Sequence, residues 1–478
     1  MQHASNSSRR NFLRNGMTLV GAAALSPSIG AQARDARIQV AEAGAAVQAA
    51  ATSPAPIVKA VKNLAGTTTS YAYAVKAGPW IFLNGHEAFD FERGLAPEVE
   101  GLPGQRLAGR PPLRREADYI LRRMRTILKE FGSDLPNAVR VDQFYTMGQA
   151  VHAYHLARFA EFGDYVPPST SIIMERCFTA RTNTHTSLIA VAPGVTIEKI
   201  TLPGQAISAS GYNPAVVANE FAFVAGNQAT AGGEGQLATG VSIPPIRNWG
   251  GENGFRRQVH YVIKQRLEPS LKAAGSELQH SLKAQAYIRG AENFPDFMDV
   301  WSQYFRDIPC AVTLSTAKDY STTASSLEIN LIALKNGARR TKQVVNVNVP
   351  PGATFGPCIR AGELIFPSGF MAVDQNGRVP AADSAQAFDA IGLAGQAQGS
   401  TVLSYAEAVC AAVGVSTANI VRAQYFMTDI RDFVGVAAAW SARYGHPHPF
   451  AAVQVPGPLP VTGARLVSDF WIYAPPAA

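Results

Sequence analysis

An apolar strand ending in glycine occurs three times in this sequence, as Trp80-Ile81-Phe82-Leu83-Asn84-Gly85, Phe221-Ala222-Phe223-Val224-Ala225-Gly226 and Leu364-Ile365-Phe366-Pro367-Ser368-Gly369. These glycines are 141 and 143 residues apart. A second marker, a glycine at the end of a predicted helix, recurs with nearly the same period at Gly132, Gly275 and Gly414. Two independent markers that share one period indicate an internal repeat.

Each repeat contains both helices and strands. The pattern predicts a strand, a polar loop, a helix, a strand, a second helix, a proline-containing turn and two final strands. It favours an α+β fold, with a mixed sheet and helices on one face. We place the repeats at 68–195, 196–340 and 341–478. The loop at 228–254 is rich in glycine and proline, and it is long enough to be a lid or to be disordered.

The N-terminal segment 1–33 resembles a twin-arginine signal peptide. Paired arginines in Ser8-Arg9-Arg10-Asn11-Phe12-Leu13-Arg14 precede an apolar run at 17–25 and the small-residue pattern Ala31-Gln32-Ala33. Such an order predicts export and cleavage rather than a stable membrane span. We therefore expect a periplasmic protein that is not inserted in the membrane after removal of the signal. Residues 34–67 are rich in alanine and are predicted to be a leader or linker.

The composition narrows the class of protein. Of 478 residues, 47% are hydrophobic and 16% are charged, which is typical of globular chains. The formal net charge of +7 suits an anionic small molecule as well as a nucleic acid. The basic helix at 114–129 shows no aromatic stacking motif between its basic residues, which, with the predicted export, argues against nucleic-acid binding. Four scattered cysteines show no zinc spacing, and the pair His446 and His448 lacks further ligands nearby, so we predict no metal and no cofactor.

Motifs in the second and third repeats resemble the Rid (YjgF) family of enamine/imine deaminases. They are Asn293-Phe294-Pro295-Asp296-Phe297 in repeat 2, and Met427-Thr428-Asp429-Ile430-Arg431 with Tyr444-Gly445-His446-Pro447 in repeat 3. Repeat 1 matches more loosely, through Phe162-Gly163-Asp164. The resemblance implies three tandem Rid-like (chorismate-mutase-like) domains. Family members are trimers with ligand clefts between subunits, so one chain with three domains is expected to form a monomeric, intramolecular pseudo-trimer.

The expected family machinery is largely missing. Family deaminases bind a substrate carboxylate with an arginine and activate water with a glutamate. The resemblance places the arginine position at Ser169, Val312 and Ala451, none of which is cationic. It places the glutamate position near His185, at Glu328 and near Ser468 or Asp469.

The clefts therefore either lost their chemistry or were rebuilt for another substrate. For rebuilt clefts, the candidate catalytic residues are Glu328, His155 and His185. The candidate ligand-binding residues, which lie near the strand-end glycines or on the last strands, are Asn84, Gly85, His86, Glu87, Arg176, Gly226, Ser368 and Gly369.

Two functions remain open from the sequence. The first is a periplasmic hydrolase or deaminase that adds water to a small organic substrate at one cleft between repeats. The second is a noncatalytic small-molecule-binding or assembly protein. An enzyme is expected to gather several of these polar candidates at one interface.

Overall fold

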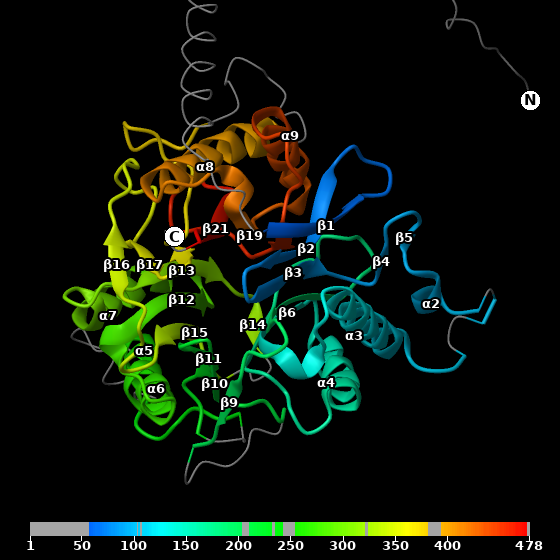
Figure 1. The fold of residues 1–478 in the computed structure, drawn as a ribbon, viewed down its shortest axis with the longest axis horizontal. Coiled ribbons are helices and arrows are strands. Elements are labelled where there is room, and N and C mark those ends of the chain that lie inside the picture. Colours follow the sequence, from blue (N-terminus) through cyan, green and yellow to red (C-terminus); the bar gives the residue numbers. More distant parts are fainter. Residues whose placement is uncertain are drawn as a thin grey trace, which may run out of the picture. The chain divides into compact units, whose positions relative to one another are not determined.

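A computed structural model of the chain describes residues 57–102, 104–105, 108–202, 210–231, 235–241, 254–320, 324–380 and 393–475 (Figure 1). The predicted signal peptide at 1–33 lies outside these residues, as do 34–56 of the predicted leader. The loop predicted at 228–254 is described in part, and Thr230 and Leu237 form a β-bridge within it. In the described part of the chain, no helix is long and apolar enough to cross a membrane.

The described chain contains three successive units that share a common order of elements: three strands, a helical segment, a strand, a helix and two final strands. Units 1 and 2 carry a few additional short elements. Unit 1 consists of β1 (Ile57–Asn63), β2 (Ser70–Ala77), β3 (Trp80–His86), β4 (Phe89–Asp90), β5 (Gly94–Leu95), α2 (Pro97–Glu100), α3 (Pro112–Glu130), β6 (Ala138–Tyr145), α4 (Gly148–Phe162), β7 (Ser169–Ile173) and β8 (Thr184–Val191).

Unit 2 consists of β9 (Ile197–Ile200), β10 (Ala215–Ala218), β11 (Phe221–Gln228), α5 (Gly254–Tyr261), a π-helical turn (Val262–Leu267), α6 (Glu268–Ala273), β12 (Ser281–Ile288), α7 (Phe294–Phe305), β13 (Ala311–Thr316), β14 (Asp319–Tyr320) and β15 (Leu327–Leu334). Unit 3 consists of β16 (Lys342–Val345), β17 (Cys358–Ala361), β18 (Leu364–Phe366), α8 (Leu393–Ala412), β19 (Ile420–Met427), α9 (Phe433–Arg443), β20 (Phe450–Gln454) and β21 (Leu466–Tyr473).

The three main sheets have one topology. Their strand orders are β1-β2-β3-β8-β6-β7, β9-β10-β11-β15-β12-β13 and β16-β17-β18-β21-β19-β20. In each sheet the last two strands are parallel and are joined by a crossover helix, α4, α7 or α9. Strand β14 of unit 2 pairs with β7 of unit 1, so the first sheet extends into the neighbouring unit.

The repeated apolar strand is buried on both faces. In β3, Trp80 and Phe82 belong to a cluster shared by all three units, whereas Ile81 and Leu83 pack with the helices of unit 1. The side chains of β11 alternate in the same way: Phe221 and Phe223 belong to the shared cluster, and Ala222 and Val224 pack with the helices of unit 2. Because successive side chains of a strand point to opposite faces, a continuous apolar run is what such a sheet requires.

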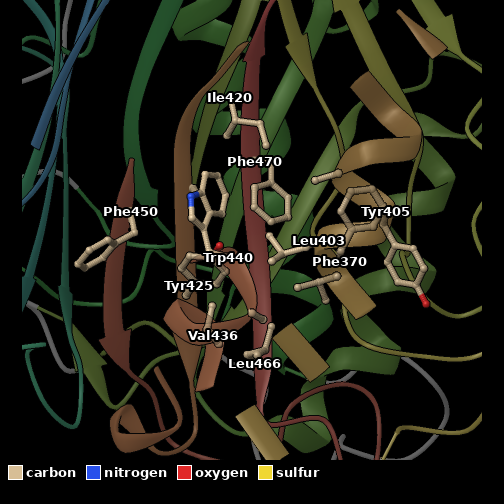
Figure 2. Packing of buried hydrophobic residues seen from close by; sticks show 14 of the residues in the cluster. Phe370, Leu403, Tyr405, Ile420, Tyr425, Val436, Trp440, Phe450, Leu466 and Phe470 are labelled. Carbon is tan, nitrogen blue, oxygen red and sulfur yellow. The ribbon is translucent and has the colours of Figure 1, made fainter. Parts of the chain in front are cut away.

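Each sheet has its own helices on one face and the shared core on the other. Figure 1 shows the helices of each unit toward the outside and the strands toward the middle. Figure 2 shows this outer packing in unit 3, where Leu403 of α8 and Trp440 of α9 lie against Tyr425 of β19 and Phe470 of β21. The described units therefore form an intramolecular pseudo-trimer of α+β domains.

A buried polar layer crosses the shared core. Along β6 the side chains that face the shared core are first apolar at Val139, then charged at Arg140 and Asp142, and apolar again at Phe144. The equivalent strands β12 and β19 repeat this change with Lys283 and Gln285, and with Arg422 and Gln424. Hydrogen bonds connect the three units in this layer: Arg422 donates to Asp142, Arg140 to Gln285, and Gln285 to Asp469.

The structure changes two expectations about the units. Residues 57–63 of the predicted leader form β1, which pairs with β2 throughout its length, so unit 1 begins before the predicted boundary at 68. Every unit also has two strands before the repeated apolar strand, whereas the pattern predicted none. These extra strands are short in units 2 and 3, with only four residues each, which is too few for a clear alternation.

Candidate functional site

The three strand-end glycines each lie where one unit meets the next. Gly85 of unit 1 approaches Ala451 and Phe450 of unit 3, and Gly369 of unit 3 donates its amide to Val312 of unit 2. Gly226 of unit 2 lies beside Glu328, which in turn contacts unit 1. We call these contacts interface A (units 3 and 1), interface B (units 1 and 2) and interface C (units 2 and 3).

Strand pairing identifies equivalent positions at the interfaces. His185 and Glu328 lie opposite Phe144 and Tyr287, which occupy the same place in units 1 and 2. The equivalent residue of unit 3 is Phe426, which lies opposite Val467, so the position expected near Ser468 falls at Val467. The position expected for the family arginine falls at Ser169, opposite Val141, and at Val312, opposite Ala284. In unit 3 the matching residue is Phe450, opposite Ala423, and not Ala451, because the sequence alignment was shifted by one residue.

Interface B contains a buried carboxyl group, Glu328 on β15, which is 3% exposed. Its Oε1 accepts a hydrogen bond from the Ser171 amide of unit 1 at 3.2 Å, and its Oε2 accepts one from Gln228 Nε2 at 2.7 Å. Burial raises the pKa of Glu328 to about 7, and these two hydrogen bonds offset only part of that effect. A Cβ atom on Gly226 would lie 2.8 Å from Glu328 Cδ, so only glycine leaves room for the carboxyl group.

A fully buried arginine lies behind interface B. Arg158 on α4 is 0% exposed and donates to Gln143 Oε1 and to Ser169 Oγ, at 3.3 Å in both cases. Ser171 Oγ donates to the same Gln143 oxygen, at 3.0 Å. Burial lowers the pKa of Arg158, but a guanidinium stays charged in proteins. Gln143 therefore links the positive charge of Arg158 to Ser171, the residue whose amide contacts Glu328.

Interface A brings Glu87 and His185 together. His185 Nδ1 lies 2.8 Å from Glu87 Oε1, and both side chains are almost completely buried. Glu87 also accepts hydrogen bonds from the amides of Phe178 and Thr179, at 2.7 Å each, and from Thr182 Oγ1 at 2.9 Å. His185 Nε2 is buried and has no hydrogen-bond partner.

Interface C is filled by protein groups. Ser368 Oγ accepts from the Val312 amide at 2.9 Å and donates to the Pro357 carbonyl at 2.7 Å. Lys283 is completely buried, donates to Thr313 Oγ1 and the Pro367 carbonyl, and forms an ion pair with Asp469. Burial lowers the pKa of Lys283, and Asp469 offsets part of that effect. The polar groups here hydrogen-bond one another, and Ser368 also lines a surface hollow.

The remaining predicted residues mostly contact main-chain groups of the protein, and none of them is arranged as a catalytic group. Asn84 donates to the Val421 carbonyl of unit 3, and His86 is 3.0 Å from the Tyr73 carbonyl. Burial lowers the pKa of His86 to about 3. Arg176 is exposed, and its main chain pairs with Gln454 of unit 3. His155 is half-buried on α4, and burial, with smaller effects from Arg158 and His152, lowers its pKa to about 3, which makes it a weak base.

Sequence reasoning missed Arg158, Gln143 and Thr182. A signal for Arg158 was present, because the inward face of α4 follows a helical period through Ala150, Tyr154, Ala157, Arg158 and Phe162. His155 lies beside this face rather than on it. Thr182 had no comparable signal, since it acts from an irregular segment before β8.

Metal-ligating side chains do not gather in the described part of the chain, where no three His, Cys, Asp or Glu residues form a group suited to a metal ion. His448 bonds Tyr425 through Nε2 and stacks on Trp440, while His446 contacts Thr417. Two surface hollows have volumes of about 450 and 460 Å³. The first is lined by Glu220, Arg339, Arg340, Thr341, Gln343, Arg360, Gly362 and Glu363. The second is lined by 344–349, Thr354, Gly356, Pro357, Cys358, Phe370 and the predicted Ser368. Neither contains Glu328 or His185, so we base the candidate site on the interface chemistry.

Comparison with known proteins identifies relatives of the second and third units. The model of the family described as endoribonuclease L-PSP matches residues 203–335 and 347–462. RidA from the Antarctic bacterium Psychrobacter is 24% identical over 28% of this chain and 99% of its own, with a TM-score of 0.23. A YjgF-family protein of Neisseria meningitidis is 21% identical over 30% of this chain and 98% of its own, with a TM-score of 0.22. No curated protein sequence is significantly similar to the chain.

Proposed function

Because the chain belongs to the endoribonuclease L-PSP (Rid/YjgF) family, whose model matches just over half of it, we propose that it is a hydrolase or deaminase. In this proposal it adds water to a small organic substrate at interface B. The observation that carries the proposal is Glu328, a buried acid with a pKa of about 7 at a contact between two units. We further propose that all three units are diverged Rid-like copies, since their sheets share one strand order.

Glu328 has the properties of a general base that works near neutral pH. A base is most effective when its pKa lies close to the working pH, and burial gives Glu328 that value. The Ser171 amide and the Gln228 side chain hold one carboxyl oxygen each, so the group has a fixed orientation. Ser171 and Gln228 are themselves half-buried, which suits a position near the opening of a cleft. In its ionised form Glu328 would take a proton from water as the water attacks an imine carbon.

Arg158 acts in this proposal as a positioning residue. It donates hydrogen bonds to Gln143 and Ser169, and the same Gln143 oxygen accepts a hydrogen bond from the Ser171 hydroxyl. Its Nε is buried without a partner. The positive charge would favour negative charge that develops on the substrate during attack. Since Arg158 is enclosed, it is not arranged to clamp a free carboxylate, so the substrate is expected to lack an α-carboxylate.

The proposal is tested by the hydrolysis of neutral aryl imines, with release of benzaldehyde from benzaldehyde imines as the measured signal. We expect Glu328→Gln to lower the catalysed rate by at least about 100-fold, the lower limit usual for a general base. The matched control is Glu198→Gln, because Glu198 is an exposed glutamate that pairs with Lys335 on the surface. Imines of ordinary amino acids should be poor substrates. Equal rates for Glu328→Gln and the unaltered chain would refute the proposal, and binding of an imine without turnover would favour the noncatalytic alternative.

We also propose that residues 1–33 direct the folded chain through the twin-arginine route to the periplasm. The supporting observation is the ordered sequence of paired arginines, apolar run and small-residue site. Replacing Arg9 and Arg10 by lysine should retain the protein in the cytoplasm, as measured by cell fractionation. Once exported, the chain is proposed to be a monomeric pseudo-trimer, and light scattering should give the mass of one chain.

A further inference from the structure

We propose a second catalytic site at interface A, in which Glu87 and His185 form a general-base dyad that activates water toward a small neutral ester or imine. This site differs from the Glu328 site in its residues, in its pair of units and in its chemistry. It does not depend on the proposed function, and either site can fail without the other.

The first step of the argument is the fixed position of Glu87. Four donors surround its carboxylate: the amides of Phe178 and Thr179, the hydroxyl of Thr182 and Nδ1 of His185. The two amides approach different oxygens, so both oxygens act as acceptors. Consecutive backbone N–H groups of this kind are a common cradle for an anion. Glu87 is therefore held as a hydrogen-bond acceptor in one orientation.

The second step is the tautomer of His185. Because Glu87 accepts a hydrogen bond from Nδ1, the proton of the neutral ring lies on Nδ1, and the hydrogen-bond network assigns it there. The lone pair is then on Nε2. A carboxylate that fixes an imidazole in this way also stabilises the imidazolium that forms when Nε2 takes a proton. This is the arrangement of a base with its orienting acid.

The third step is that Nε2 is unused. The nitrogen is buried and has no partner, although buried polar atoms are normally hydrogen-bonded. Gly85 lies beside the ring and keeps some accessible surface, while its neighbours Asn84 and His86 are buried. A Cβ atom on Gly85 would lie 3.0 Å from His185 Cε1 and 3.0 Å from Ala451 Cα. Glycine at this position therefore lets the main chain of unit 1 approach the edge of the imidazole ring, where a larger residue would collide.

The surroundings define the class of substrate. Phe144 lies 5.9 Å from the His185 ring, and Phe450 and Ala451 of unit 3 form the opposite wall at Gly85. Phe178, whose amide holds Glu87, packs on Phe450 with ring centres 5.2 Å apart. No lysine or arginine side chain hydrogen-bonds Glu87 or His185 in the described part of the chain. Apolar walls without a cation favour a neutral substrate with an aromatic body.

The chemical step balances without any added reagent. His185 Nε2 takes a proton from water while the water oxygen forms a bond to the carbonyl or imine carbon, and the π electrons move to the oxygen or nitrogen. When the tetrahedral intermediate breaks down, the imidazolium returns the proton to the departing oxygen or nitrogen. For an imine, His185 also moves the proton of the new hydroxyl group to the nitrogen as the C=O bond forms, so the amine leaves with both protons of the water. Histidine and Glu87 are then back in their starting states, and the products are an acid and an alcohol, or a carbonyl compound and an amine.

The first test measures whether Nε2 is accessible in the full, unaltered chain. Diethyl pyrocarbonate acylates unprotonated imidazole nitrogens, and mass spectrometry of peptides locates the adduct. We expect an adduct at His185 and at the exposed His152, and none at His448, whose Nε2 is bonded to Tyr425 in the core. Labelling of His152 with none at His185 would show that the nitrogen is closed to ligands and would overturn the proposal.

The second test measures hydrolysis of 4-nitrophenyl acetate, a neutral aryl ester. We expect His185→Asn to lower the rate by at least about 100-fold, and Glu87→Gln to lower kcat more than it changes KM. His152→Asn is the matched control, because it removes an exposed histidine and should leave the rate unchanged. A rate retained by folded His185→Asn would overturn the proposal. If that variant does not fold, the labelling of the unaltered chain decides.

Discussion

The buried polar layer of the shared core gives the sharpest prediction about stability, through Asp142→Asn. Asp142 accepts a hydrogen bond from Arg140 Nε of its own unit at 2.9 Å and from Arg422 Nη2 of unit 3 at 2.7 Å. All three side chains are at most 4% exposed. Burial alone would raise the pKa of Asp142, but the two arginines outweigh it and hold the pKa below its ordinary value.

The magnitude follows from what the substitution leaves behind. Removing one partner of a buried ion pair costs about 3–5 kcal/mol, because the other charge stays buried and unpaired. Asparagine keeps one acceptor oxygen, but it places an NH₂ group against the second guanidinium. We therefore expect Asp142→Asn to lower the free energy of unfolding by about 3–5 kcal/mol. Asp299→Asn is the control: Asp299 is 60% exposed and pairs with Arg256 on the surface, so its loss should cost no more than about 1 kcal/mol.

Urea unfolding followed by tryptophan fluorescence measures both variants. Since units 1 and 3 share this carboxylate, the unfolding midpoint should fall without a separate transition for one unit. The pH dependence has a definite sign. A carboxyl whose folded pKa is lowered contributes stability above its unfolded pKa, and that stability is lost as the pH falls through the folded pKa. In Asp142→Asn, the free energy of unfolding should therefore fall less steeply as the pH is lowered. A loss no larger than that of Asp299→Asn would refute our account of the layer.

Three further outcomes are expected. Imine hydrolysis should rise with pH through about 7 as Glu328 loses its proton, with Tyr145, Tyr320 and Asp142 as its titratable neighbours, and Glu328→Gln should remove this limb of the pH–rate profile. Gly226→Ala should displace Glu328 and abolish the activity, whereas Gly445→Ala, with open space around it, should not. Because burial raises the pKa of all four free cysteine thiols, a thiol reagent should label none in the native protein and all four in urea; they are Cys177, Cys310, Cys358 and Cys410.

The repeated architecture was predictable because it has two local signals. A strand buried on both faces needs a continuous apolar run, and Trp80-Ile81-Phe82-Leu83 supplies it. A helix that ends in a left-handed residue favours glycine, and Gly132, Gly275 and Gly414 all have positive φ. The short first strands gave no such signal. Strand β1 was hidden by the alanine-rich stretch before it, although Ile57–Asn63 pairs fully with β2.

The candidate sites were predictable only as a set of residues. Glu87 and His185 were both singled out from the sequence, but their contact joins residues 98 apart and depends on how β3 and β8 meet in the sheet. Arg158 could have been found from the inward face of α4. His155 on the same helix was selected from the sequence instead, because an imidazole is a common general base. The raised pKa of Glu328 could not be predicted from the sequence, because it results from burial in the folded chain, where residues of units 1 and 2 surround the carboxyl group.

Joining three units in one chain explains why the interfaces differ. In a symmetric trimer of separate chains, any substitution at one interface appears at all three. Here Lys283 closes interface C through Asp469 and the Pro367 carbonyl, whereas its counterparts Arg140 and Arg422 turn toward Asp142 in the centre. Interface C can therefore stabilise the assembly, while our proposals assign the chemistry to His185 at interface A and to Glu328 at interface B.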